Sequence, residues 1–169
     1  MQSQLDIIED ETDVSPIDTV EDVLSANNWR FNRLNDDELL VDITGKTGSY
    51  KLFFIWQEDM NALQFCAQLD QEVEPNNLPT AQKAILKLNE DLWMGHFDIP
   101  LATNKPSFRH TALLPRASRA QTMEVIESLV DVSLAQCERH YPLFALLSSA
   151  NDLDDQVLSL AVMDTVGES

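Results

Sequence analysis

The chain has 169 residues, 44% of them hydrophobic, and carries 11 Lys and Arg against 29 Asp and Glu, a formal net charge of −18. This length suits one domain with a sizeable core, and the apolar content is too high for a disordered protein. The charge repels phosphate backbones and anionic lipid heads, so we expect neither nucleic acid nor a membrane as a partner.

An acidic mobile tail is predicted over residues 1–15, where acids occur without a sustained hydrophobic period. A single domain is then predicted over 16–150. Its first helix is expected over 17–27, because apolar residues recur there at helical spacing. We expect Asp18 or Thr19 to cap this helix.

Three or four strands are predicted next, from the segments FNRL, ELLVDIT, SYKLFFIWQ and ALQFCAQLD. In the third segment, Tyr50, Leu52, Phe54 and Trp56 share one face. Phe53 and Ile55 lie on the other, so this strand is apolar on both sides and its second face needs a cover. The cover could be the long helix, the tail helix, a second copy of the protein or a client segment.

A second helix is predicted in PTAQKAILKLNEDLWM, beginning at Pro79 or Thr80, with Trp93 as the last residue of its apolar stripe. Gly95 follows that stripe and is expected to end the helix. A strand with Phe97, Ile99 and Leu101 on one face should come next.

The segment SFRHTALL is predicted to return as the second strand of a hairpin. One register that matches the apolar faces places Asp98 opposite Arg109, as a cross-strand ion pair on the polar face. His96 falls on that polar face as well, and His110 falls on the apolar face.

A long helix is predicted from Ser118 to about Ser149, with a buried stripe along its length. Leu134 or Ser133 continues the stripe, and Pro142 should bend or split the helix. Residues 151–169 are predicted to be a C-terminal helical tail. The element order α-β-β-β-α-β-β-α indicates an α+β fold with an antiparallel sheet of about five strands packed by helices.

This order, together with the segments NEDLWMGHFDI, FRHTALL and AQCERHYPLF, resembles the YbjN family of bacteria, and most of all its alphaproteobacterial branch. The resemblance covers roughly Ser15 to Ser149. It implies a sensory transduction regulator with a fold like that of type III secretion chaperones, which are α+β dimers that bind unfolded protein segments. The family brings no agreed catalytic residues, so none are assigned.

Chemistry-bearing residues are few. His96, His110 and His140 lie 14 and 30 residues apart, whereas zinc ligands usually occur in close pairs, so we expect no metal. Asp98 with His96 or Arg109 could form a general acid–base set. An Asp–Arg pair such as Asp98 and Arg109 is more often a structural ion pair. Because catalytic motifs and a glycine-rich phosphate loop are absent from the sequence, we expect no enzyme and no cofactor.

The two cysteines, Cys66 and Cys137, form no CxxC pair and are interpreted as small apolar core residues with reduced thiols. The first residues lack the basic and apolar regions of a signal peptide, and no apolar run is long enough to span a bilayer. We therefore expect a cytoplasmic protein.

The function that these observations favour is a non-enzymatic regulator or chaperone-like module that binds another protein. Its predicted interaction surface consists of Phe53, Ile55, His96, Asp98 and Arg109. The acidic charge favours a partner with a basic surface, unless it only maintains solubility, and a homodimer is a further expectation. One alternative is a small-molecule sensor with a pocket between sheet and helix, and a less favoured one is an enzyme that uses Asp98 and a histidine.

Overall fold

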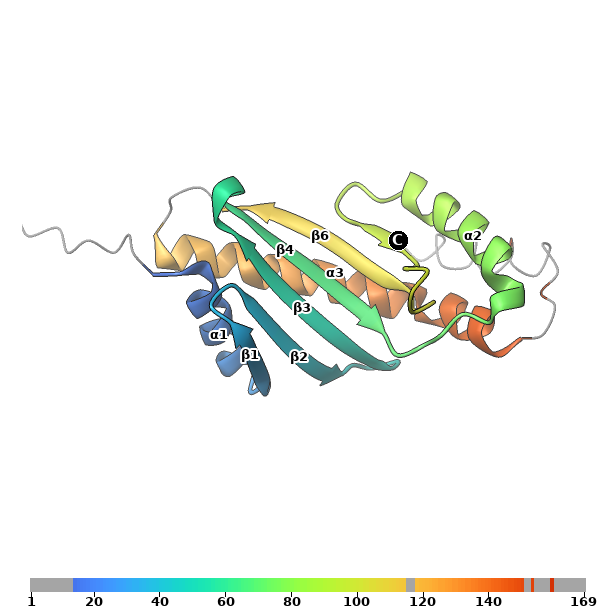
Figure 1. Ribbon diagram of the computed structural model, residues 1–169, viewed down its shortest axis with the longest axis horizontal. Helices are drawn as coiled ribbons and strands as arrows, with labels where there is room; N and C mark the ends of the chain where they lie inside the picture. The colour runs from blue at the N-terminus through green and yellow to red at the C-terminus, as the bar shows by residue number, and fades with distance from the viewer. Residues whose placement is uncertain (1–13, 115–117, 151–152, 154–158, 160–169) are drawn as a thin grey trace, which may run out of the picture.

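A computed structural model describes residues 14–114, 118–150, 153 and 159. These residues form a six-stranded antiparallel sheet, in the order β1-β2-β3-β4-β6-β5, and three α-helices (Figure 1). The strands are β1 Phe31–Asn35, β2 Glu38–Thr44, β3 Ser49–Gln57, β4 Ala62–Leu69, β5 His96–Asp98 and β6 Ser107–Leu113. The helices are α1 Pro16–Ala26, α2 Leu78–Glu90 and α3 Arg119–Ser149. The α+β prediction is confirmed, with one strand more before α2 than the predicted order contained.

Helix α1 begins one residue earlier than expected. Pro16 occupies its first turn, and the Ser15 side chain accepts a hydrogen bond from the Ile17 amide. Proline presets the backbone for this position and has no N–H to satisfy, so Ser15 is the cap. The predicted caps have other roles, because Thr19 is buried and Asp18 binds Arg33 at 2.7 Å.

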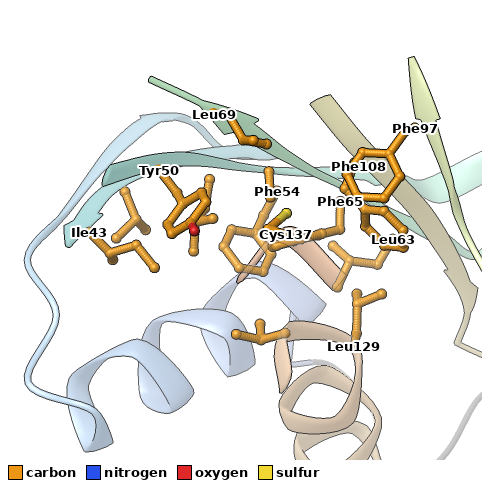
Figure 2. Close-up of a cluster of buried hydrophobic side chains, with 14 of the residues drawn as sticks. Ile43, Tyr50, Phe54, Leu63, Phe65, Leu69, Phe97, Phe108, Leu129 and Cys137 are labelled. Atoms are coloured by element: carbon orange, nitrogen blue, oxygen red, sulfur yellow. The ribbon is translucent and has the colours of Figure 1, made fainter. Parts of the chain in front are cut away.

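The core lies between one face of the sheet and the helices α1 and α3, which run behind the strands in the view of Figure 1. Alternate residues of each strand point to this face, as the two-residue period of a strand requires. Figure 2 shows Tyr50, Phe54 and Phe65 pointing from the sheet toward the helices, and the Phe54 and Phe65 rings meet edge to face at 5.0 Å.

Helix α3 starts with a capping box, in which the side chains of Ser118 and Gln121 bond each other's backbone amides. It continues unbroken through Pro142, so of the two predicted outcomes, a bend or a split, the split does not occur. Both candidates for the stripe face the core: Leu134 is partly buried and packs against it, and Ser133 is fully buried. Burial of Ser133 is possible because its hydroxyl donates a hydrogen bond of 2.6 Å to the Leu129 carbonyl.

The connection from α2 to β5 differs from the prediction. The helix ends at Glu90, since the Asn89 side chain accepts from the Phe97 amide at 2.8 Å and donates to its carbonyl at 3.0 Å. Trp93 is therefore outside the helix and 99% exposed. Gly95 adopts φ +71° just before β5, where a Cβ would overlap the Phe108 ring.

Strand β5 has only three residues, so Leu101 lies in a turn and is 79% exposed instead of continuing the strand. Helix α2 packs against β5 at this end of the sheet. The predicted tails, residues 1–15 and 151–169, fall almost wholly outside the described residues. The domain limits thus stay predictions.

The loop between β2 and β3 is held against α3 by one carboxylate. Glu138 accepts hydrogen bonds from the Lys46 amide at 2.8 Å, and from the Thr47 amide and hydroxyl at 3.0 and 2.6 Å. Burial raises the pKa of Glu138, but these hydrogen bonds outweigh it and hold the pKa below its ordinary value. Gly48 permits the approach, because a Cβ there would overlap the Tyr141 ring.

Candidate functional site

The side of the sheet opposite α1 and α3 is called the open face here. It presents the alternate strand residues that do not point into the core, such as Leu40 on β2, Phe53 and Ile55 on β3, and Cys66 on β4. These four side chains are partly buried, and in the view of Figure 1 no described helix lies over β2, β3 and β4 on this side. Side chains that would be core on the other face are thus accessible here.

The strand pairing aligns the predicted surface residues in one row. Phe53 lies opposite Cys66, Cys66 opposite Arg109, and Arg109 opposite His96, across β3, β4, β6 and β5. Ile55 starts the neighbouring row on the same face. The structure therefore brings residues as far apart in the chain as Phe53 and Arg109, 56 positions, onto one surface.

The predicted hairpin register was wrong by two residues. His96, and not Asp98, lies opposite Arg109, while Asp98 lies opposite Ser107. The ion pair forms nevertheless, along the diagonal, with 2.7 Å between Arg109 Nε and Asp98 Oδ2. Diagonal neighbours on one face remain within reach of a long side chain such as arginine. His110 points to the helix-covered side, opposite Phe65, as the alternation predicted.

The open face is hollowed where these rows meet. The hollow has a volume of about 420 Å³, and its lining includes Phe53, Ile55, Cys66, His96, Arg109 and Thr111. Its apolar side chains Phe53 and Ile55 come from β3, whereas its polar and charged side chains come from β4, β5 and β6, with Gln64 on β4. Such a mixture can hold an apolar group and orient it with a few polar contacts.

Charge on the open face is nearly balanced. Its strand residues include the carboxylates Glu38, Asp42 and Asp98 and the cations Lys51 and Arg109. Lys51 lies 3.7 Å from Asp42, and Arg109 pairs with Asp98. The face thus differs from the molecule as a whole, whose net charge is −18.

Cys66 belongs to the open face and not to the core, which corrects the expectation for this residue. Burial raises the pKa of its thiol, and the Arg109 cation offsets this only in part. A thiol with a raised pKa is a poor nucleophile at neutral pH. Cys137 is fully buried, as expected.

The three histidines occupy separate environments. His96 is exposed on the open face, His110 is partly buried on the other side, and His140 is buried on α3 against the Phe97 ring at 5.4 Å. Burial lowers the pKa of His110, and lowers that of His140 to about 4. Among residues 14–114 and 118–150, no three His, Cys, Asp or Glu side chains gather in a way that could hold a metal ion.

Sequence reasoning missed Trp93 as a surface residue. It stands in the turn 91–95, which leads directly into Gly95 and His96, two residues that line the hollow. Met94 beside it is 51% exposed. Asn89 and Asp91 could have predicted the early end of the helix, because Asn and Asp favour helix ends and turns over helix interiors.

Together, these features define an α+β domain with one sheet face in the core and the other available for contact. Within the described part of the chain, no helix is both long and apolar enough to cross a membrane. A family model described as "Putative bacterial sensory transduction regulator" matches residues 16–146. The chain belongs to this family, YbjN.

Among solved structures, the chain is similar to the crystal structure of YbjN from E. coli, described as "a putative transcription regulator". The two share 13% sequence identity with a TM-score of 0.48, over 74% of this chain and 93% of that one. No curated protein matches the sequence.

Proposed function

We propose that this chain is a non-enzymatic bacterial regulator that acts by binding another protein on the open face. The observation that carries the proposal is the pair Phe53 and Ile55, which form the apolar part of the hollow and are only partly buried. Fully burying such a side chain contributes about 1.5–3 kcal/mol. Membership of a family of described regulators supports the same conclusion.

The partner that fits best is a protein segment with apolar residues flanked by Lys or Arg. Its apolar residues would enter the hollow, and its basic residues would be attracted by the −18 charge of the chain. Long-range attraction of this kind accelerates association and weakens as salt screens it. This mode resembles the binding of unfolded segments by chaperones and requires no catalytic group.

The test combines capture with a direct affinity measurement. Tagged wild-type protein, Phe53→Lys and the control Leu86→Lys are used to capture partners from the native bacterium at low and high salt. Leu86 is 69% exposed on α2 and does not line the hollow. Leu86→Lys therefore controls for replacing an accessible apolar side chain by lysine away from the hollow.

We expect wild type and Leu86→Lys to enrich the same basic protein, less at high salt, and Phe53→Lys to lose it. Calorimetry with the purified partner should then show at least a tenfold weaker affinity for Phe53→Lys. Equal affinities of Phe53→Lys and wild type, or no partner at low salt, would refute the proposal.

A small-molecule sensor is the second candidate, and the hollow itself favours it. Its volume of about 420 Å³ lies within the range of ligand sites, although it opens on the open face and not between sheet and helix. A metabolite that binds there should raise the melting temperature of wild type and not that of Phe53→Lys. A screen of metabolite classes without such a shift would remove this candidate.

A further inference from the structure

We propose that a second copy of this chain covers the open face in the absence of another partner, and that Trp93 of each copy enters the hollow of the other. The inference rests on the proposed function in one respect. Since the same face would bind the regulated protein, self-association and partner binding would exclude each other.

The first observation is that Trp93 projects into solvent from a fixed turn. Its side chain is 99% exposed, and an indole of this kind offers roughly 150–250 Å² of apolar surface. The turn that carries it is anchored at both ends, by the Asn89 side chain bound to the Phe97 backbone and by Gly95 packed against Phe108. A large aromatic on a fixed turn loses little conformational entropy on binding, which is typical of interface hot spots.

The second observation is that the projecting residue and the hollow border each other. Gly95 and His96, which follow Trp93 by two and three residues, line the hollow. A two-fold symmetric contact uses the same surface of both subunits, so that surface must contain both complementary parts. The open face and its turn meet this condition. Phe53 and Ile55 could receive the apolar indole, and the Arg109 guanidinium offers a cation–π contact.

The charge distribution selects the same surface. Two copies that each carry −18 repel one another, and the outer side of α3 adds exposed acids such as Glu124, Glu127 and Asp131. On the open face, two ion pairs offset most of the charge. Two copies therefore approach with less repulsion through this face than through α3.

The area available indicates a weak dimer. Two Trp93 side chains would bury roughly 300–500 Å², against the ~1,000 Å² that a specific interface needs. Met94, Phe53 and Ile55 of both copies supply further apolar area. Because the second copy brings no excess of basic charge, a basic partner would displace it. Self-association would then keep the apolar hollow covered until the partner binds.

The test measures sedimentation velocity of the full chain over a wide concentration range. Wild type should show a concentration-dependent dimer, and Trp93→Ser and Phe53→Lys should each weaken it at least tenfold. Leu86→Ser removes another exposed apolar side chain of the same region and should leave the dimer unchanged.

Mixing the two weak variants makes the test specific. Trp93→Ser keeps an intact hollow and Phe53→Lys keeps an intact Trp93, so one complete contact forms only between unlike copies. The mixture should therefore dimerise more strongly than either variant alone, which a folding defect would not produce. A monomeric wild type, an unweakened Trp93→Ser dimer or a mixture without restored association would each overturn the inference.

The outcome is separable from that of the proposed function. If wild type is monomeric while Phe53→Lys still loses the captured partner, only the dimer is refuted. If the dimer and its restoration are found and no partner is captured, the dimer stands and the proposed function fails.

Discussion

The two faces of the same sheet have different consequences for the molecule. Strand β3 contributes apolar residues to both, with Tyr50, Leu52 and Phe54 on the covered face and Phe53 and Ile55 on the open one. The first three are almost completely buried under α1 and α3, whereas the other two are only partly buried. Apolar residues of the same strand thus stabilise the fold on the covered face and form a contact surface on the open face.

The largest expected effect compares two adjacent phenylalanines. Phe54→Ala should lower the free energy of unfolding by about 3–5 kcal/mol, because it leaves a cavity beside Phe65 in the core. Phe53→Ala should lower it by less than about 1 kcal/mol, since its environment is already partly solvent. Urea denaturation of both variants checks this difference. Similar losses would mean that the open face is covered within the monomer.

The next effect concerns the buried histidine of the covered side. Because the pKa of His140 is lowered to about 4, the unfolded chain binds a proton near pH 6.5 that the folded chain does not. Stability should therefore fall by about 2–3 kcal/mol as the pH decreases from 6.5 to 4, and change no further through this group below that. In His140→Phe, the free energy of unfolding should not show this decrease between pH 6.5 and 4. The measurement compares the unfolding free energies of wild type and variant as a function of pH. Parallel curves would contradict the prediction.

A smaller loss of stability is expected when the contact between the β2–β3 loop and α3 is weakened. Glu138→Gln should destabilise the protein by about 1–2 kcal/mol at pH 7, because it weakens hydrogen bonds to Lys46 and Thr47. The folded pKa is depressed, so the stabilisation is present above the unfolded value of about 4.3 and disappears as the pH falls through the folded pKa.

The control for this variant is Glu127→Gln, an exposed acid on the same helix. Its unfolding free energy at pH 7 should stay within about 0.5 kcal/mol of wild type. A loss at Glu127 as large as that at Glu138 would show that general charge, and not the loop contact, is responsible.

The smallest stability effect belongs to the open face. Asp98→Asn should cost less than about 1 kcal/mol, because its ion pair with Arg109 is about 36–48% exposed and screened by water. Thermal unfolding at low and high salt measures this directly. A loss of several kcal/mol would indicate that the pair is buried by a second molecule in solution.

Much of the fold was predictable because it depends on local patterns. The strand segments and the long helix were recognised from the two-residue and helical periods of their apolar residues, and their bounds agree closely with the structure. The errors occurred where single polar side chains decide the outcome. The Asn89 side chain binds the backbone of Phe97, which follows it by eight residues, and α2 ends there. Trp93 therefore lies on the surface and not in the helix.

The candidate site was predictable only in part. Alternation placed Phe53, Ile55, His96, Asp98 and Arg109 on the side away from the core, because side chains of a strand change face at every residue. It could not supply the order of strands, in which β6 lies between β4 and β5. Without that order, the alignment of Phe53 with Arg109 and His96, and the place of Cys66 between them, could not be predicted.

By itself, the sequence determined the α+β class, the apolar faces of the strands and the strongly acidic charge, since these follow from composition and short-range periodicity. Only the tertiary structure decided which apolar face is covered, how the β5–β6 register runs and where the hollow forms. These features depend on contacts between segments far apart in the chain, and their energies arise only when the segments have met.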